Sequence, residues 1–225
     1  TIWTILDCSR KRNDSQYNRL HRNVEKSAKL YVKRISIMDK LLGQSRFYFA
    51  QCVFNTSCHY AAYNRHEKER DKRHKIALWI SGTSILILCL TVLGWETDCQ
   101  TLLSILSFIG IALTAASMIF GLYNKEDLTE IMYCHKQAAE DYKQLRDLFM
   151  DIIRQIKSGK DISTLEPILQ QYLHDYSTLG KYSMTTNEDD YKSAQKSLGL
   201  NGEGETFTWS KEEINKFLPI ELREK

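Results

Sequence analysis

Two long uncharged apolar stretches, separated by three residues, constrain this chain more than any other feature. Residues 76–95 (IALWISGTSILILCLTVLGW) carry no charge, and neither do residues 99–123 (CQTLLSILSFIGIALTAASMIFGLY). A helix needs about 20 apolar residues to cross the hydrocarbon core of a bilayer, so each stretch is long enough. The intervening Glu96-Thr97-Asp98 leaves room only for a tight turn. We therefore predict a transmembrane hairpin, because a chain of 225 residues is too short to bury two such helices in a soluble core.

Charged residues are distributed unevenly on the two sides of this hairpin. Residues 1–75 contain 17 lysines and arginines against seven acidic residues, whereas residues 124–225 contain 14 against 19. Basic residues concentrate at 65–75, directly before the first span, while the turn holds only Glu96 and Asp98. Since positively charged flanks remain in the cytoplasm, we expect both termini on the cytoplasmic side of the membrane.

Helix breakers are scarce, which predicts an all-α integral membrane protein in four parts. Residues 1–75 are expected to form a basic helical hairpin, broken at Gly43, that leads into the first span. Residues 76–123 form the transmembrane hairpin (76–95 and 99–123), and residues 124–157 continue the second span as one long cytoplasmic helix. Residues 158–225 form a small helical appendage. Its predicted helices begin at a capping box at Ser163-x-x-Glu166, span Glu188–Leu198 before Gly199, and follow a second capping box at Ser210-x-x-Glu213.

The second span carries a stripe of small and hydroxyl-bearing residues with alternating spacings of three and four. Such a stripe has two interpretations, which the sequence leaves open. Small residues allow close packing between transmembrane helices, and hydroxyl groups can hydrate a pore that several copies enclose around an axis. In the pore interpretation, Phe108 or Phe120 forms a hydrophobic gate, and Glu96 and Asp98 surround the outer mouth. The predicted pore-lining residues are Ser107, Gly110, Thr114, Ser117 and Gly121.

The same helical register continues beyond the span, where the residues of the stripe become apolar. Outside lipid, an apolar stripe favours association between helices. We therefore expect this side of the helix to join copies of the chain in a homo-oligomer. The residues of this predicted seam are Leu128, Ile131, Tyr142, Leu145, Phe149 and Ile152.

A basic stripe runs along the first predicted helix without an acidic residue in its own register. A solvated helix face normally mixes charges of both signs, because pairs four residues apart are then stabilising. A stripe of one sign suits an anion such as a lipid headgroup, a nucleotide or single-stranded nucleic acid, with an ordinary solvated helix face as the alternative. The predicted ligand-binding residues are Arg19, Arg22, Lys26, Lys29, Lys33 and Lys40.

No motif for catalysis, phosphate binding or zinc binding is apparent in the chain, so we expect neither an enzyme nor a bound cofactor. Cys58-His59 and Cys134-His135 are adjacent pairs, whose side chains diverge by about 100° on a helix. A metal site built from them is a weaker alternative to ordinary buried or surface side chains. The Glu188-Asp189-Asp190 run is expected to be a solvated helix end.

The order of a helical region, a basic run, two spans with a minimal turn and a long helix resembles the SLATT proteins (SMODS- and SLOG-associating two-transmembrane effectors). The resemblance covers about residues 15–160. It is closest in TAASMIFGLYNKEDLTEIMYCHKQAAEDYKQLRDLF at residues 114–149 and YNRLHRNVEKSAKLYVKRI at residues 17–35.

This resemblance implies a prokaryotic defence effector in the bacterial inner membrane, whose pores depolarise or kill an infected cell. It also implies a partner nucleotidyltransferase that acts through its nucleotide product. One branch, the effector of the Hailong anti-phage system, is similar in outline, and there a short DNA oligomer controls a tetrameric channel. The chain is accordingly expected to be a homotetrameric, ligand-gated channel, with a non-conducting membrane scaffold as the alternative.

Overall fold

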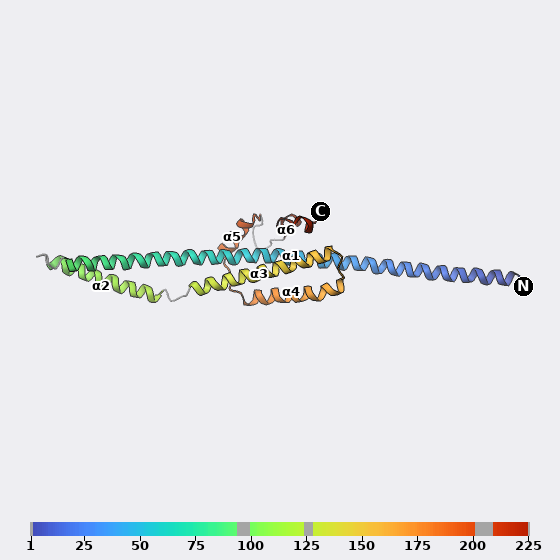
Figure 1. Ribbon diagram of the computed structural model, residues 1–225, viewed down its shortest axis with the longest axis horizontal. Coiled ribbons are helices and arrows are strands. Elements are labelled where there is room, and N and C mark those ends of the chain that lie inside the picture. The colour runs from blue at the N-terminus through green and yellow to red at the C-terminus, as the bar shows by residue number, and fades with distance from the viewer. Residues whose placement is uncertain (1, 94–99, 124–127, 201–208, 225) are drawn as a thin grey trace. The chain divides into compact units, whose positions relative to one another are not determined.

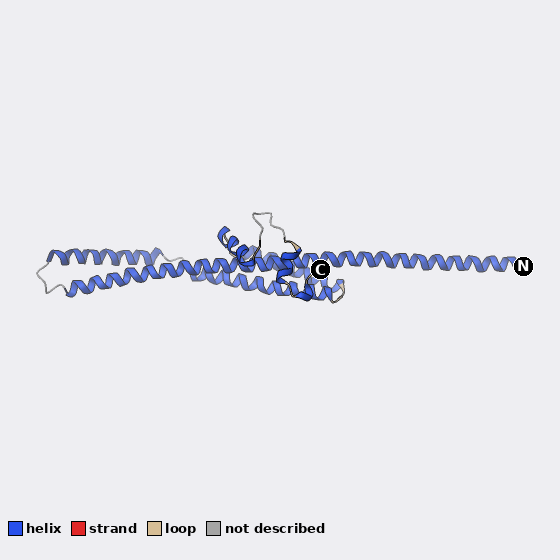
Figure 2. Ribbon diagram, turned by 90° about the horizontal axis from the view of Figure 1, so that it is seen from above, coloured by secondary structure: helices blue, strands red, loops and turns tan. Residues whose placement is uncertain are grey.

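The structure, a computed structural model, describes residues 2–93, 100–123, 128–200 and 209–224. Within these ranges all regular structure is helical, which confirms the predicted all-α class (Figure 2). Two compact units make up the chain: Thr1–Gln51 with Leu145–Ser177 and Trp209–Lys225, and Cys52–Gln144 with Thr178–Thr208. The elements labelled in Figure 1 are α1 (Ile2–Leu93), α2 (Gln100–Tyr123), α3 (Leu128–Lys157), α4 (Ile162–Tyr182), α5 (Glu188–Leu198) and α6 (Lys211–Phe217), followed by a 3-10 helix, Ile220–Leu222.

Helix α1 passes through Gly43 without interruption, so the predicted helical hairpin within residues 1–75 is wrong. A glycine inside a helix costs only about 1 kcal/mol relative to alanine, and the flanking Leu41, Leu42 and Gln44 favour helix. No heavy atom lies within 4 Å of the position that a Cβ of Gly43 would occupy. A single glycine with no turn-forming neighbour therefore does not end this helix.

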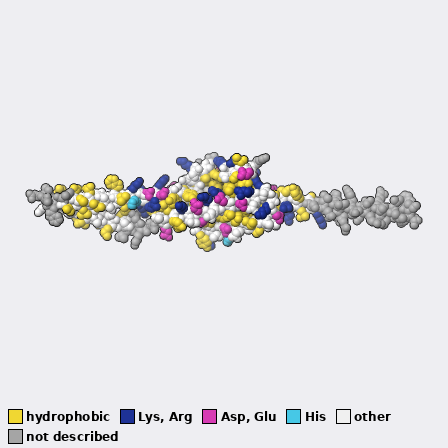
Figure 3. Space-filling model, viewed as in Figure 1, with side chains coloured by type: hydrophobic (Ala, Val, Ile, Leu, Met, Phe, Trp, Pro, Cys, Tyr) yellow, Lys and Arg dark blue, Asp and Glu magenta, His cyan; other side chains and the backbone are white. Residues whose placement is uncertain are grey.

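The two apolar stretches form helices whose side chains remain largely uncovered. In both α1 and α2, the most apolar 18-residue stretch is only 6% buried, although each helix is long and apolar enough to cross a membrane. Figure 3 shows hydrophobic side chains predominating at the end of the molecule that holds these stretches. A core helix of a soluble protein would be mostly covered, so these two helices belong to a membrane protein.

Two predicted features of the hairpin fall in the gaps between the described ranges. The turn with Glu96 and Asp98 lies outside the described residues, and so does the junction at residues 124–127 between α2 and α3. The continuity of the second span with α3 therefore stays a prediction.

The core of the first unit is built from aromatic and aliphatic side chains of α1, α3 and α4. Phe149 is fully buried, with its ring stacked on Tyr48 at 5.8 Å and edge-on to Tyr172 at 6.0 Å. Leu165 and Leu169 of α4 are buried in the same unit. This packing places the apolar faces of three helices against one another.

Arg46 is a buried cation that holds the C-terminal segment of the first unit. Its side chain is only 3% exposed, and its guanidinium donates to the backbone oxygen of Leu222 at 3.2 Å and to Asn215 Oδ1 at 2.7 Å. Glu224 Oε1 lies 3.4 Å from Arg46 Nε. A buried charge is tolerated when hydrogen bonds and a counter-charge surround it, as they do here.

The short C-terminal helices follow their capping residues. Ser210 caps α6 in the predicted capping box with Glu213, and α5 spans the predicted residues 188–198. Gly199 ends α5 at φ 62°, a left-handed conformation that glycine adopts without strain. The capping box predicted at Ser163 is wrong, because α4 begins one residue earlier and the Ser163 hydroxyl donates to Asp161 instead.

Candidate functional site

A line of hydroxyl groups joins the two membrane-spanning stretches inside the second unit. Ser84 Oγ of α1 lies 2.9 Å from Thr114 Oγ1 of α2, and Ser81 Oγ lies 3.4 Å from Ser117 Oγ. Thr114 also donates to the backbone oxygen of Gly110 at 2.8 Å. Because a threonine hydroxyl has one proton, Ser84 is the donor to Thr114. We call Ser81, Ser84, Thr114 and Ser117 the hydroxyl line.

Close approach of the two helices accompanies these hydrogen bonds. Gly110 is buried, and a Cβ at this position would lie 3.4 Å from Cγ2 of Ile87. Small residues at such contacts let transmembrane helices pack closely, and hydroxyl groups bond across them. The structure therefore brings three predicted pore-lining residues, Gly110, Thr114 and Ser117, against α1 of the same chain.

The remaining residues of the predicted stripe and gate are more accessible. Ser107 and Phe120 are half-buried, Gly121 is exposed, and Phe108 is 74% exposed. The sequence analysis missed Ser81 and Ser84, although Ser81-Gly82-Thr83-Ser84 is the most polar part of the first apolar stretch. This local polarity is the sequence signal from which a polar contact of the first span could have been predicted.

Outside the spans, the second unit contains a cluster of His59, His66 and His135. His59 Nδ1 lies 3.1 Å from His135 Nδ1, so one ring donates and the other accepts. The rings of His66 and His135 stack with centroids 5.7 Å apart, and His59 stacks on Tyr142 at 5.6 Å. We call these three histidines the histidine cluster.

A buried ion pair borders the histidine cluster. Asp190 is 2% exposed and accepts from Arg65 Nε at 2.9 Å and from Arg65 Nη2 at 3.0 Å. Asp190 also accepts from the backbone N–H of Asn187, which completes the capping box of α5. The expectation that residues 188–190 form only a solvated helix end is thus wrong for Asp190, because this residue pairs with α1.

Burial and neighbouring charge keep the three histidines neutral at physiological pH. Burial, followed by the nearby His135, lowers the pKa of His59 to about 4. Burial and then His66 lower the pKa of His135, while burial and then Arg65 lower the pKa of His66. Burial raises the pKa of Asp190, but the hydrogen bonds from Arg65 and the Asn187 backbone, together with the charge of Arg65, outweigh it, so this pKa lies below its usual value.

The histidine cluster lacks the ligand arrangement of a metal centre. No group of three or more histidine, cysteine, aspartate or glutamate side chains in the described ranges could hold a metal ion. Cys58 is buried, and burial raises the pKa of its thiol to about 12, whereas Cys134 is exposed. The two Cys-His pairs therefore contribute their histidines, and not their thiols, to a common site.

Comparison with known families identifies this arrangement of spans and helices. A model of the SMODS and SLOG-associating 2TM effector domain family 4 matches residues 41–213. The chain belongs to this family. Searches among curated proteins and among solved structures found no match.

In this 2TM effector, the predicted seam on α3 is largely covered by the chain itself. Leu128, Tyr142, Leu145, Phe149 and Ile152 are each at most 7% exposed, and Ile131 is half-buried. Packing within one chain accounts for this apolar stripe without a second copy. That these six residues join copies of the chain therefore stays a prediction, and five of them have little exposed surface for such a contact.

The predicted ligand stripe of the 2TM effector lies on the N-terminal part of α1. Lys26, Lys29, Lys33 and Lys40 are exposed, but Lys29 pairs with Glu25 at 2.6 Å, so the stripe is partly compensated. The side chains of Arg19 and Arg22 lie outside the described residues. Glu25, one helical turn before Lys29, supplies this counter-charge, which was not predicted from the sequence.

Replacing Asp190 tests the buried ion pair in the 2TM effector. We expect Asp190→Asn to lower the free energy of unfolding by about 2 kcal/mol, less than for a fully buried pair because Arg65 is 35% exposed. Chemical denaturation followed by circular dichroism in detergent measures this change. Asp189→Asn is the matched control, since Asp189 is exposed. Equal stability of the two variants would contradict the assignment.

The histidine cluster predicts that this protein loses stability in mild acid. Between the ordinary histidine pKa of about 6.5 and the value of about 4 for folded His59, the unfolded chain binds more protons than the folded chain. Stability therefore falls as pH is lowered through this window, by up to roughly 1.4 kcal/mol per pH unit for each such proton.

Comparison of two variants isolates this effect from the titration of carboxylates. Thermal unfolding between pH 4.5 and 6.5 should depend less steeply on pH in His59→Gln than in the unmodified protein. His174→Gln is the control, because His174 is exposed on α4. Identical pH profiles for all three proteins would exclude His59 as a source of the acid sensitivity.

Proposed function

We propose that this 2TM effector assembles in the membrane as a homo-oligomer, with a tetramer as the expected state, and conducts ions through a pore lined by the hydroxyl line. A nucleotide or short single-stranded DNA bound at the basic stripe of α1 controls conduction, and a nucleotidyltransferase partner supplies it. Two spans cannot enclose a channel alone, so conduction requires several copies. The observation that carries this proposal is a polar line within two otherwise lipid-exposed apolar helices.

The hydroxyl line retains accessible surface after its internal hydrogen bonds are made. Thr114 is exposed, and Ser81 and Ser117 are half-buried. The neighbouring exposed positions on α2 are apolar, so a second hairpin placed against this side would meet the only row of hydroxyl groups that both spans share among the described residues. Hydroxyl groups lining a narrow passage keep it hydrated, whereas apolar constrictions close it by dewetting.

Assembly between copies is supported by apolar side chains that the single chain leaves uncovered outside the spans. Tyr31 and Ile35, four residues apart and therefore on one face of α1, are 67% and 41% exposed. Burying apolar surface gains roughly 25 cal/mol per Å², so a cluster of large uncovered side chains favours association. This region of α1 replaces the covered α3 seam as our proposed contact between copies.

The anion site is proposed on Lys26, Lys33 and Lys40, together with Arg19 and Arg22. The three lysines are exposed on α1 at intervals of seven residues, which places them along one side of the helix over about 21 Å. A row of ammonium groups of this length matches the spacing of several phosphates and suits an oligonucleotide.

A non-conducting scaffold is the second candidate function. It is favoured by the pairing of Ser84 with Thr114, which satisfies both hydroxyl groups inside one hairpin. In that case the polar residues serve helix packing only, and the basic stripe recruits a partner or anionic lipid.

Replacing Thr114 by valine separates the two functions. Valine has the shape of threonine without its hydroxyl, so we expect Thr114→Val to reduce ion flux through liposomes at least fivefold if the line hydrates a pore. Thr83→Val is the control, because the Thr83 hydroxyl bonds only to the backbone of its own helix at Trp79. Cross-linking confirms that assembly is retained. If the unmodified protein conducts no ions with any of the ligands tested, the pore is excluded and the scaffold is the remaining function.

Charge reversal on α1 tests ligand control. Lys26→Glu combined with Lys33→Glu should weaken binding of a short single-stranded DNA at least tenfold, because two phosphate contacts become repulsive. The same change should remove any effect of the DNA on flux. Lys136→Glu with Lys143→Glu on α3 gives the same change in net charge and should leave binding intact. Retained regulation in the α1 variant would place the ligand site elsewhere.

A further inference from the structure

One side of α1 changes from basic to aromatic to apolar at the point where the helix enters its membrane-spanning part. Lys68, Lys72, Lys75 and Trp79 follow one another at spacings of four, three and four residues. Gly82 and Leu86 continue the same register, and Leu86 lies 18 positions after Lys68, which corresponds to five helical turns, or about 27 Å. All of these residues therefore lie along a single face.

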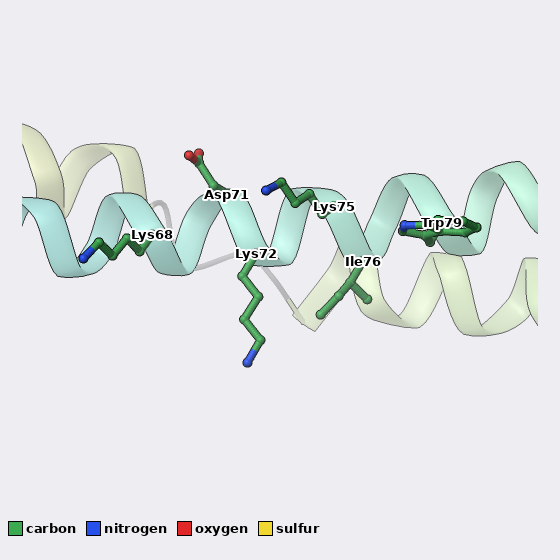
Figure 4. Close-up of a pocket in the computed structure, with 6 residues that line it drawn as sticks. All are labelled: Lys68, Asp71, Lys72, Lys75, Ile76 and Trp79. Atoms are coloured by element: carbon green, nitrogen blue, oxygen red, sulfur yellow. The ribbon is translucent and has the colours of Figure 1, made fainter.

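The basic part of this face borders an open groove. Its volume is about 400 Å³, and it is lined by Lys68, Asp71, Lys72, Lys75, Ile76 and Trp79. Figure 4 shows Lys75 on the same side of the helix as Asp71, with Lys72 and Ile76 extending from the opposite edge. Trp79 lies nearer the membrane-spanning part of α1. Ammonium groups are thus spread around the groove and not gathered at one point.

Among the described residues, the three lysines of the groove form no ion pair, and the acids beside them on α1 are engaged. Glu69 pairs with Arg73, and Asp71 pairs with Arg70 at 3.2 Å. Glu67 accepts a hydrogen bond from the Tyr63 hydroxyl. No ion pair in the described part of the chain includes Lys68, Lys72 or Lys75, and all three are exposed. The groove therefore has unused positive charge.

An apolar groove follows directly along the same face. Its volume is about 330 Å³, and it is lined by Leu78, Trp79, Gly82, Thr83 and Leu86. Trp79 belongs to both grooves and is 78% exposed. No heavy atom lies within 4 Å of the position for a Cβ at Gly82, so this glycine leaves open space at the middle of the groove.

We infer that the two grooves bind one anionic phospholipid. Its phosphate and headgroup lie among Lys68, Lys72 and Lys75, the glycerol region lies at Trp79, and one acyl chain lies over Gly82 and Leu86. The site goes beyond the proposed pore, since it depends only on membrane insertion and not on conduction or on the basic stripe at residues 19–40.

The combination of the two grooves favours a lipid over a soluble anion. Juxtamembrane lysines bind anionic headgroups, and tryptophan prefers the membrane–water interface. A free phosphate or an oligonucleotide uses the lysines but makes no contact with the apolar groove. A lipid contacts both grooves. The order of lysines, tryptophan and apolar residues along α1 matches the order of its headgroup, glycerol region and acyl chain.

Native mass spectrometry of the full chain in detergent tests the inference by titration with dioleoyl phosphatidylglycerol and, separately, dioleoyl phosphatidylcholine. We expect preferential retention of phosphatidylglycerol. Lys68→Gln with Lys72→Gln should weaken this retention about 30-fold, because each juxtamembrane lysine contributes roughly a fivefold gain in affinity for an anionic headgroup. Lys136→Gln with Lys143→Gln removes the same charge from exposed positions on α3 and should have no effect.

A second pair of variants tests the apolar groove while leaving the lysines in place. Gly82→Leu fills the open space and should weaken retention of phosphatidylglycerol roughly fourfold, which corresponds to the burial of about one methylene group of the acyl chain. Ala112→Leu adds a side chain at an exposed position of α2 and should leave retention unchanged.

Several outcomes would overturn the lipid site. One is equal retention of the two lipids, and another is equal retention of phosphatidylglycerol by the Lys68/Lys72 variant and its α3 control. Displacement of the lipid by millimolar inorganic phosphate would show a site for the anion alone, and displacement by a short single-stranded DNA at equal concentration would show a nucleic-acid site. Failure of Gly82→Leu to differ from Ala112→Leu would exclude an acyl chain from the groove.

Discussion

The apolar surface of the two spans is the constraint on which the rest of this structure depends. Neither span is covered by the chain, so both require lipid or another copy of the hairpin as their surroundings. Inside that environment, unpaired polar groups are costly, and Ser84, Thr114 and the Gly110 backbone satisfy one another. Beyond it, the same α1 helix must carry charged, water-exposed residues and a packed core. The change of environment along one helix explains why lysines, tryptophan and apolar residues succeed one another there.

Polar contacts connect the helices of the second unit to one another. Arg65 and Asp190 connect α1 to α5, and His59 and His135 connect α1 to α3. Asp190, His59 and His135 are buried, Arg65 is partly exposed, and each has a partner of complementary chemistry. Such contacts are directional, so they specify one packing of the helices where aliphatic side chains alone would permit several.

Features that repeat along a helix could be predicted from the sequence, whereas contacts between distant segments could not. The apolar stretches, the α5 boundaries and the Ser210 cap depend on neighbouring residues, and these predictions are confirmed. The meeting of His59 with His135 involves residues 76 positions apart, and one sequence contains no signal for it. The helix break predicted at Gly43 does not occur, because one glycine costs little in a helix whose other residues favour helical structure. The α3 stripe was correctly apolar, but periodicity does not distinguish packing within a chain from packing between chains.

The direction of the hydrogen bonds in the hairpin has a chemical consequence. Ser84 gives its proton to Thr114, and Thr114 gives its own to the carbonyl of Gly110. Both hydroxyl protons are therefore used within the hairpin, and Thr114 Oγ1 retains only the capacity to accept a further hydrogen bond. A group that approaches Thr114 Oγ1 can therefore bond to it only as a hydrogen-bond donor, because neither hydroxyl proton of the Ser84–Thr114 pair is free.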